Sequence, residues 1–367
     1  MARSSPRRTE SPLPACFATV QPGMEPMAAD EITRDLGGDV KKAARGIVVF
    51  RVNAIDERLL ALRTTEDVFL LAWGSDSLSY SSADLKTIQS WTARKADWPA
   101  LFRIHHALRP MKKGKPTFHL VAQMQGEHGY RRVDALDAMA DGLAGKIPAG
   151  WLPAEENAWL EIWLQILGKT AVCGLRLSDR TMRHRTYKTE HVAASLRPTV
   201  AAAMVRLAGA GPGMTVLDPM CGAGTILAEQ IELARKRKAG TVAVLGGDED
   251  PNAVHCADEN LAGVGPAELV RWDATALPLS AASVDRVISN PPFGKQLSAP
   301  EKIGELYRHM VREADRVLIP GGRAVYLVGE PEPLRAAAEA VRWVPIRQLR
   351  LRVLGQQATL AVWNKPG

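Results

Sequence analysis

The spacing of hydrophobic residues predicts a first small α+β unit in residues 16–75. A short strand is expected first, then an amphipathic helix, a β-rich run, a helix capped by Asn53 and an apolar strand. Their expected bounds are 16–20 for the strand, 25–36 for the helix, 46–52 for the β-rich run and 68–73 for the last strand.

In residues 76–180 the hydrophobic residues again follow helical spacing in some segments and strand spacing in others. A Ser-rich stretch leads into helices at 84–92 and 98–108, and further elements are expected as a strand at 117–123, a helix at 133–144 and strands at 159–167 and 170–177. The last two strands are joined through Gly168 and Lys169, which is typical of a hairpin. A second α+β unit is therefore predicted.

From residue 181 the rhythm changes to a regular alternation of strand and helix. After a helix at 192–207, strands are expected at 215–218, 241–248, 268–272, 284–289 and 323–328, and helices at 225–238, 252–262, 301–318 and 332–341. Such alternation predicts an α/β domain with a doubly wound parallel sheet. Residues 344–353 and 357–363 read as an antiparallel hairpin that closes one edge.

The N-terminal residues, the apolar runs and the cysteines are those expected of a cytoplasmic globular protein. Residues 1–15 are rich in Ser, Pro and Arg and predict a disordered tail without a secretory signal. No apolar run approaches the ~20 residues that a bilayer crossing needs. The four cysteines stand singly, at positions 16, 173, 221 and 256, so neither a disulfide framework nor a metal site is expected.

Charge is distributed unevenly along the chain. Lys and Arg number 47 against 40 Asp and Glu, a net charge of +7. Residues 1–200 carry 28 basic and 22 acidic side chains, whereas residues 201–367 carry 19 and 18. A basic N-terminal half is compatible with a module that binds a polyanion, and equally with a solvated basic surface.

The segment 218–225, DPMCGAGT, comes directly after the first strand of the wound sheet and opens a helix. Gly222 and Gly224 allow a ligand to approach bare backbone, and the helix N-terminus offers unpaired N–H groups. Leu227 occupies the third position of a dinucleotide fingerprint, and Asp218 ends the strand, which disfavours a pyrophosphate. An acid at this place suits the cationic amine of S-adenosylmethionine; the alternative is a Gly-rich turn without a ligand.

Acidic residues also follow the next two strands. Asp248, in the segment GGDED, is placed to accept the ribose hydroxyls, and Asp273 to accept the adenine amino group. The alternative is that these acids only cap helices. The predicted cofactor site comprises Asp218, Met220, Cys221, Gly222, Gly224, Thr225, Asp248, Glu249, Asp273 and Ala274.

After the fourth strand comes Asn290-Pro291-Pro292-Phe293. It matches the (N/D)PP(F/Y) pattern of methyltransferases that act on amino groups. The Asn290 side-chain oxygen and the Pro291 carbonyl can accept the N–H groups of an exocyclic amine and direct its lone pair, while Phe293 stacks on the base. No cysteine or titratable base lies in this loop, so methylation at cytosine C5 or at oxygen is disfavoured. A Pro-Pro turn with a core Phe is the structural alternative.

On these motifs, residues 191–367 resemble the class I, S-adenosylmethionine-dependent, Rossmann-like methyltransferases, and the chain from Cys16 onward resembles the THUMP-domain tRNA guanine-N2 methyltransferases. The helical entry 191–199, HVAASLRPT, is also similar to that family. The resemblance implies a ferredoxin-like domain at 16–75, a THUMP RNA-binding domain at 76–180 and the catalytic domain at 181–367. It further implies methylation of a guanosine 2-amino group in the tRNA acceptor stem, at position 6, with the THUMP domain on the 3′ end.

A base paired in a stem has to be flipped to reach a pocket, and phosphate contacts elsewhere must offset that cost. Ten basic residues are candidates for these contacts, although each of them taken singly could also be a solvated surface charge. They are Arg109, Lys112, Lys113, Lys115, Arg131, Arg132, Arg180, Arg183, Arg185 and Lys188. His105 and His106 are expected to be structural or surface residues.

Three alternatives stay open at this point. They are an rRNA guanine-N2 or adenine-N6 methyltransferase, a catalytically idle RNA-binding adaptor, and a nicotinamide oxidoreductase, against which Leu227 argues. A monomer is favoured.

Overall fold

The computed structural model describes residues 13–111, 113–192, 195–238, 240–293, 300–353 and 355–367, with only the backbone of 300–302. The expected tail lies almost wholly outside these residues, as do Lys112 and part of the 191–199 segment. The chain forms two compact units. The first contains residues up to 19, 29–62 and 67–179, and the second contains 20–28, 63–66 and 180–367.

An eight-stranded sheet runs through the first unit in the order β2-β3-β1-β4-β8-β7-β5-β6. Its strands are β1 (Cys16–Thr19), β2 (Asp39–Ala44), β3 (Ile47–Arg51), β4 (Asp67–Ser75), β5 (Thr117–Gln125), β6 (Leu152–Pro153), β7 (Leu160–Leu167) and β8 (Thr170–Arg176). The two predicted α+β units therefore share one sheet. They meet at β4, which pairs with β1 on one side and with β8 on the other.

The first part of this unit follows the ferredoxin-like order of elements. Helix α1 (Glu25–Leu36) lies between β1 and β2, and a short 3₁₀ helix, η1 (Glu57–Ala61), precedes β4. The expected helix after Asn53 is thus only one 3₁₀ turn, capped by Asp56, and a single residue of it, Leu59, is buried. With so little apolar surface to cover, a longer helix would gain no packing energy.

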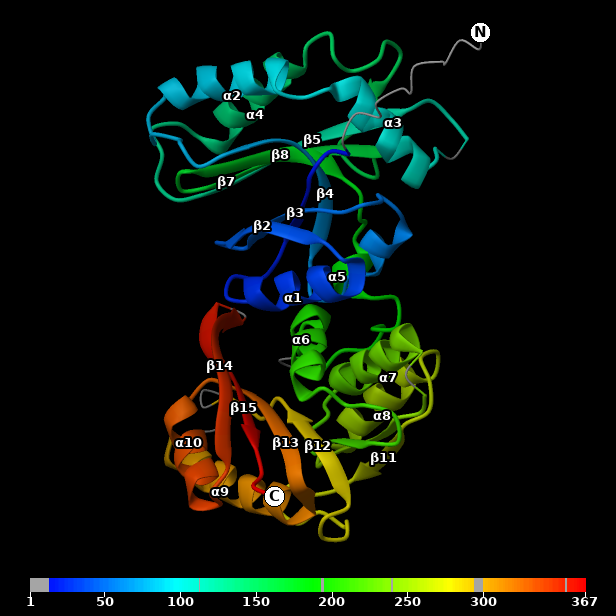
Figure 1. Ribbon diagram of the computed structural model, residues 1–367, viewed down its shortest axis with the longest axis vertical. Helices are drawn as coiled ribbons and strands as arrows, with labels where there is room; N and C mark the ends of the chain where they lie inside the picture. The colour runs from blue at the N-terminus through cyan, green and yellow to red at the C-terminus, as the bar shows by residue number, and fades with distance from the viewer. Residues whose placement is uncertain (1–12, 112, 193–194, 239, 294–299, 354) are drawn as a thin grey trace, which may run out of the picture. The chain divides into compact units, whose positions relative to one another are not determined.

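In the second part of the unit, helices cover one face of the sheet (Figure 1). They are α2 (Ala83–Arg94), α3 (Trp98–Leu108) and α4 (Arg132–Leu143), all close to their expected bounds. Trp98 and Phe102 of α3 are buried with their rings 5.9 Å apart. On the other part of the sheet, Phe17 and Phe69 stack at 4.5 Å between centroids.

The second unit holds a seven-stranded sheet in the order β11-β10-β9-β12-β13-β15-β14. Its strands are β9 (Thr215–Asp218), β10 (Ala243–Asp248), β11 (Glu268–Arg271), β12 (Val284–Ser289), β13 (Leu318–Val328), β14 (Val344–Val353) and β15 (Gln356–Asn364). β11, β10, β9, β12 and β13 are parallel, and β14 and β15 form the expected antiparallel hairpin at one edge. The predicted α/β, Rossmann-like class is confirmed.

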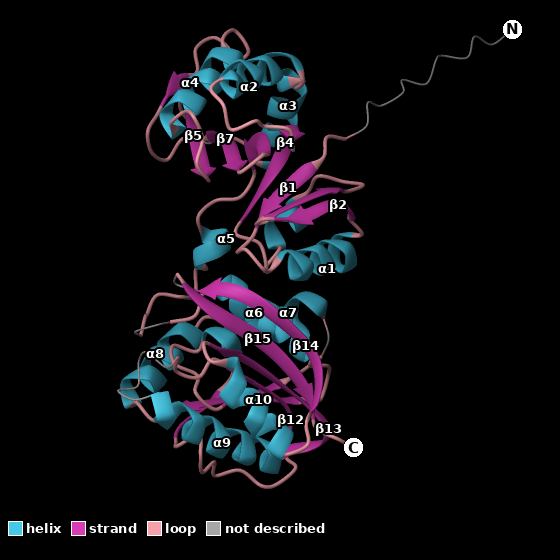
Figure 2. Ribbon diagram, turned by 90° about the vertical axis from the view of Figure 1, so that its left-hand side faces the viewer, coloured by secondary structure: helices cyan, strands magenta, loops and turns pink. Residues whose placement is uncertain are grey.

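Helices cover both faces of this sheet (Figure 2). They are α6 (Pro198–Ala208), α7 (Thr225–Arg237), α8 (Pro251–Leu261), α9 (Pro300–Val317) and α10 (Pro331–Ala340), and the short helix α5 (Thr181–His184) precedes them without covering the sheet. Alternate strand residues face opposite sides: Leu217 and Val287 pack in the cluster that contains α9 and α10, while Val216 and Ile288 pack in the cluster that contains α6. This double coverage accounts for the nearly continuous apolar character of the central strands.

The sequence placed the start of α6 too early. The helix begins at Pro198, where the missing N–H costs nothing in the first turn, and the described residues just before it, 195–197, are not helical. None of the helices in the described part of the chain is long and apolar enough to span a bilayer.

Candidate active site

The loops after β9, β10, β11 and β12 meet at the carboxyl ends of the parallel strands. The strand order reverses between β9 and β12, which is where open α/β sheets bind ligands. A cavity of about 570 Å³ lies there. It is lined by all four residues of the predicted acceptor loop, 290–293, and by every predicted cofactor residue except Gly224.

Asp218 is the buried acid of this cavity, with 1% of its surface exposed. Its Oδ1 accepts hydrogen bonds from the Ser289 hydroxyl at 2.9 Å and from the Met220 N–H at 3.2 Å. Its Oδ2 is buried and has no partner among the described residues. Burial raises the pKa of Asp218 to about 7, against the Ser289 hydrogen bond, which lowers it. A cationic ligand group would both neutralise this carboxylate and satisfy its second oxygen.

The two glycines of this loop, Gly222 and Gly224, have different structural roles. Gly222 and Gly224 have φ of +51° and +72°, a region that L side chains rarely adopt. A Cβ at Gly224 would lie 3.1 Å from the Ala257 Cβ, so this glycine allows α7 to pack closely against α8. We therefore reassign Gly224 from ligand contact to packing, while Gly222 remains in the cavity wall.

Asp248 and Asp273 end β10 and follow β11, and both line the cavity. Asp248 Oδ2 accepts the Gly222 N–H at 3.0 Å and its Oδ1 accepts the Asp250 N–H at 3.1 Å. Asp248 thus fixes the glycine loop while each oxygen keeps a second lone pair for a ligand hydroxyl. The Thr275 N–H and hydroxyl hold the pKa of Asp273 below its usual range, so this acid is charged at neutral pH.

The acceptor loop is held from three sides. Tyr307 donates its hydroxyl hydrogen to the Pro292 carbonyl at 3.2 Å. The Phe293 ring lies over Gly329, where a Cβ would approach it to 3.3 Å, and it packs against the core cluster that contains Val353 and Ala358. The Asn290 Oδ1 is buried with no partner among the described residues. Asn290 thus belongs to the cavity wall and carries a carboxamide oxygen that no described residue satisfies.

Part of the cavity wall was missed by sequence reasoning. Val192, Ser195 and Leu196 line it from the segment before α6, and the buried Ser195 hydroxyl lacks a partner among the described residues. Asn260 of α8 positions this segment, because its Oδ1 accepts the Glu190 N–H at 2.9 Å and its Nδ2 donates to the Ala223 carbonyl at 2.9 Å. Asn260 is a single polar residue on a helix, and nothing in the sequence around it predicts that it connects Glu190 with Ala223.

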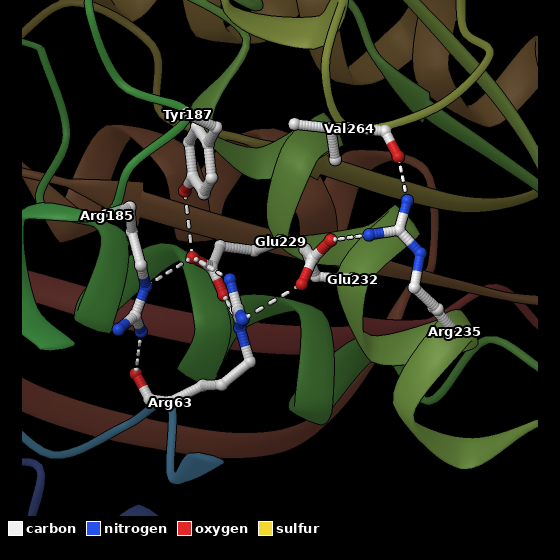
Figure 3. Close-up of polar contacts among 7 residues, drawn as sticks. All are labelled: Arg63, Arg185, Tyr187, Glu229, Glu232, Arg235 and Val264. Atoms are coloured by element: carbon white, nitrogen blue, oxygen red, sulfur yellow. Dashed lines mark hydrogen bonds and ion pairs between the residues drawn. The ribbon is translucent and has the colours of Figure 1, made fainter. Parts of the chain in front are cut away.

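A second group of buried charges holds the segment that leads to this wall (Figure 3). Glu229 on α7 is fully buried, and its Oε1 accepts from Arg185 Nε at 3.0 Å and from the Tyr187 hydroxyl at 2.8 Å. Arg63 donates to both Glu229 oxygens, at 2.6 and 2.9 Å, and to Glu232 at 3.2 Å. Burial opposes the charged form of Glu229, but the two arginines hold its pKa below the usual range.

This group corrects part of the predicted phosphate-binding set. The Arg185 side chain is only 7% exposed and serves Glu229, and Lys188 donates to the Leu196 carbonyl. Burial lowers the pKa of Lys188 to about 8. Neither side chain is available to a phosphate, because each already satisfies a partner inside the second unit.

The other basic candidates lie nearer to solvent. Lys113, Lys115 and Arg180 are exposed. Arg109 pairs with Asp179, Arg131 with Asp134, and Arg132 donates to the Ala122 carbonyl, whereas Arg183 is half-buried. His105 is buried, and burial lowers its pKa to about 4, which agrees with a structural role; His106 is exposed.

These features fit S-adenosylmethionine. The cavity has the volume of a small-molecule site. Asp218 offers a buried oxygen for a cationic amine, Asp248 free lone pairs for ribose hydroxyls, and Asp273 a charged acceptor for the adenine amine. Among the described residues there is no cluster of three or more metal-ligating side chains. Fold and site together define a class I, S-adenosylmethionine-dependent methyltransferase.

Comparison with known proteins supports this class. Residues 185–357 match the family model described as "RMKL-like, methyltransferase domain". The chain is 29% identical over 325 residues to a tRNA (guanine(6)-N2)-methyltransferase of Thermus thermophilus, covering 87% of this chain and 90% of that one. It resembles the crystal structure of TrmN from Thermus thermophilus with a TM-score of 0.77 and 27% identity, over 96% of this chain and 99% of that chain.

A human relative matches over a shorter region. It is the U6 snRNA (guanine-N(2))-methyltransferase THUMPD2, 35% identical over 218 residues, which are 58% of this chain and 41% of the relative. The chain thus spans less than half the length of that protein. Residues 185–357 match the methyltransferase-domain model of the RMKL-like family, and the chain is an enzyme that uses S-adenosylmethionine. The resemblance to the guanine-N2 methyltransferases is confirmed.

Proposed function

We propose that this enzyme methylates the exocyclic 2-amino group of a guanosine in the acceptor stem of tRNA, at position 6. The observation that carries the proposal is the buried, unpartnered Asn290 Oδ1 in the wall of the cofactor cavity. An oxygen acceptor in this position suits a substrate that brings N–H donors, because a buried acceptor left without a donor costs free energy. The tRNA relative from Thermus thermophilus acts on guanine N2 at a position numbered 6.

In the proposed reaction, the loop of residues 290–293 orients the exocyclic amine, which is a weak nucleophile. S-adenosylmethionine, when bound, supplies a methyl carbon made electrophilic by its sulfonium. Asn290 Oδ1 and the Pro291 carbonyl accept the two N–H hydrogens of the amine, so that its lone pair points out of the base plane. The amine nitrogen would form its bond to the methyl carbon as the methyl–sulfur bond breaks, the electron pair of that bond would stay on the sulfur of the S-adenosylhomocysteine that leaves, and the nitrogen would release one proton. None of the four residues from Asn290 to Phe293 is titratable, so that proton leaves to water.

The target base must leave its stack to reach this cavity. Flipping costs a few kcal/mol, which stacking on Phe293 partly offsets, since base–aromatic stacking is worth ~1–3 kcal/mol. Phosphate contacts supply the rest. For these we retain Arg109, Lys113, Lys115, Arg131, Arg132, Arg180 and Arg183, and leave out Arg185 and Lys188. Lys112 stays a prediction, because it lies outside the described residues.

We assign residues 16–180 to RNA binding. Residues 16–75 are taken as a ferredoxin-like domain and 76–180 as a THUMP domain that holds the 3′ end of the RNA, with the catalytic domain at 181–367. The exposed Lys113 and Lys115 lie in the THUMP part. Cys16, Cys173, Cys221 and Cys256 are free thiols, in keeping with action in a reducing cytoplasm, where we expect the enzyme to work as a monomer.

The decisive experiment is methylation of unmodified tRNA transcripts with labelled S-adenosylmethionine, followed by nucleoside identification and site mapping. We expect N2-methylguanosine at a single acceptor-stem position. Methylation of adenine N6, or of a loop nucleotide only, would contradict the proposal.

A second RNA substrate is favoured by one observation, the similarity to a U6 snRNA guanine-N2 methyltransferase over the catalytic region. Parallel incubation with tRNA, rRNA and other structured RNAs separates these candidates. An enzyme that methylates only rRNA would keep the chemistry proposed above and change the substrate. A chain that fails to bind S-adenosylmethionine in calorimetry would instead be an RNA-binding adaptor.

A further inference from the structure

The hairpin at the edge of the second sheet contributes one polar side chain to the cavity. Val353 and Gln356 are paired across the hairpin and both line the cavity. Neither residue belongs to the loops that follow the parallel strands. Gln356 therefore adds to the site from an element that the cofactor motifs do not include.

The alternation of β15 determines which residue faces the cavity. Ala358, Leu360 and Val362 pack in the core cluster on the α6 side of the sheet, whereas Ala361 and Trp363 pack in the cluster on the other side. Because side chains alternate along a strand, Gln356 lies on the α6 side and Gln357 on the opposite side, across from Arg352. Gln356 is thus a polar residue at the end of an apolar face, where that face reaches the cavity.

The same face carries the aromatic ring of the acceptor loop. Phe293 packs against the cluster that includes Val353 and Ala358, the residues that flank Gln356 on this face of the hairpin. The acids of the cavity come from the loops after β9, β10 and β11, while Asn290 and Gln356 carry carboxamides. A carboxamide has both a donor and an acceptor, and no described residue binds that of Gln356, whose side chain is exposed.

A guanine and an adenine with their amines at Asn290 present different neighbouring groups. Guanine shows an N1–H donor and then the O6 acceptor, two adjacent polar groups that a carboxamide can bind together. Adenine shows the N1 acceptor and then an apolar C2–H. One hydrogen bond is then lost, and a neutral hydrogen bond is worth roughly a factor of three to ten.

Resting on the function proposed above, we infer that Gln356 reads the Watson–Crick edge of the flipped base and selects guanine over adenine. Its carbonyl accepts N1–H and its amide donates to O6. Asn290 fixes the amine, and Gln356 distinguishes which purine carries it. Gln356 is a specificity-determining residue, whereas the orientation of the amine is left to the acceptor loop.

Base analogues in the RNA test this assignment. 2-Aminopurine keeps the 2-amino group but presents an N1 acceptor and an apolar C6–H, the pattern that adenine shows. 2,6-Diaminopurine presents an N1 acceptor and a 6-amino donor, which the Gln356 carboxamide can bind after turning over. Transcripts assembled by ligation carry guanine or either analogue at the mapped target nucleotide.

Single-turnover rates are measured for the wild type, Gln356→Ala and Gln357→Ala. We expect the wild type to prefer guanine and diaminopurine to aminopurine, and Gln356→Ala to lose about three- to tenfold of that preference. The intrinsic reactivity of each base is the same for every variant, so it cancels in the comparison. Gln357→Ala is the matched control and should keep the wild-type ratios.

Calorimetry with S-adenosylmethionine verifies that each variant is folded. An unchanged guanine-to-aminopurine ratio in Gln356→Ala, or an equal change in Gln357→Ala, would overturn the inference. If the wild type forms N2-methylguanosine, such a result leaves the proposed function standing. If the wild type forms none, the proposed function falls, and the role of Gln356 falls with it.

Discussion

The Ser289 hydroxyl donates a 2.9 Å hydrogen bond to Asp218 Oδ1, and so joins the ends of β12 and β9. This bond connects the two halves of the site, because Asp218 opens the cofactor loop and Ser289 precedes Asn290. It also leaves Asp218 Oδ2 as a buried oxygen without a partner among the described residues. The acid is therefore oriented before any ligand binds, which lowers the entropy cost of binding.

Replacing Asn290 tests the chemistry of the acceptor loop. Asn290→Ala removes the oxygen that orients the amine, and we expect methyl transfer to fall by about 100-fold or more, in line with the loss of one preorganised polar group. RNA affinity should remain near the wild-type value. Single-turnover methylation and filter binding measure the two quantities. Asn290→Asp, which keeps an acceptor oxygen at the Oδ1 position, should retain more activity than Asn290→Ala; equal activity of Asn290→Ala and wild type would remove the proposed role.

Asp218 makes cofactor binding depend on pH. Its pKa is about 7 in the free enzyme, and only the carboxylate attracts the cationic amine of S-adenosylmethionine. Affinity should therefore rise by up to about tenfold per pH unit between pH 5 and 7, a range in which the α-amino group of the ligand keeps its proton. Titration calorimetry measures this. In Asp218→Asn the affinity should be weak and nearly independent of pH, and a steep dependence in that variant would assign the effect to another group.

The same residue should cost the ligand-free enzyme stability at high pH. Its folded pKa lies above the value of 3.8 for the free side chain, so its favourable contribution is complete below that value and is lost as pH rises through about 7. At pH 8, Asp218→Asn should exceed the wild type in free energy of unfolding by at most about 4 kcal/mol. This difference should disappear near pH 4. Urea unfolding without ligand measures it, and a constant difference across pH would contradict this account.

Glu229 is expected to stabilise the second unit more than its neighbour Glu232. Glu229→Gln removes the buried carboxylate that the Arg63 and Arg185 guanidinium groups share, while Arg63 keeps its ion pair with Glu232, and we expect a cost of about 3–5 kcal/mol. The pKa of Glu229 is lowered, so its contribution is present above its unfolded pKa and is lost as pH falls. Glu232→Gln serves as control, since that side chain is 23% exposed and should cost less than about 1 kcal/mol. Similar losses in both variants would refute the buried ion-pair explanation.

The salt dependence of RNA binding tests the basic residues of the first unit. If Lys113 and Lys115 contact phosphates, each change to Ala should lower the slope of log affinity against log salt by about 1. Lys146→Ala, an exposed lysine of the same unit outside the predicted set, should leave the slope unchanged. Electrophoretic mobility shifts at several salt concentrations provide the slopes. Equal slopes for all three variants would remove Lys113 and Lys115 from the interface.

Much of the second unit could be predicted from the chain alone. The strand-helix alternation, the acids that follow β9, β10 and β11, and the residues 290–293 are local patterns, since each depends on residues close together in sequence. They also define the cofactor chemistry, because the carboxyl ends of parallel strands must meet at one edge of a sheet. By itself the sequence therefore determined the fold class, the cofactor and the acceptor loop.

Only the tertiary structure decided which polar groups have partners. The sequence predicts that Arg185 binds phosphate. In the structure Arg185 instead forms a buried ion pair with Glu229, which lies 44 positions away in the chain. Asn260 and Gln356 lie in segments without a motif, and they gain their roles from a bridge to Ala223 and from a place on the cavity wall. Hydrogen bonding and burial depend on residues brought together from distant parts of the chain, and the local periodicity of the sequence does not predict such long-range contacts.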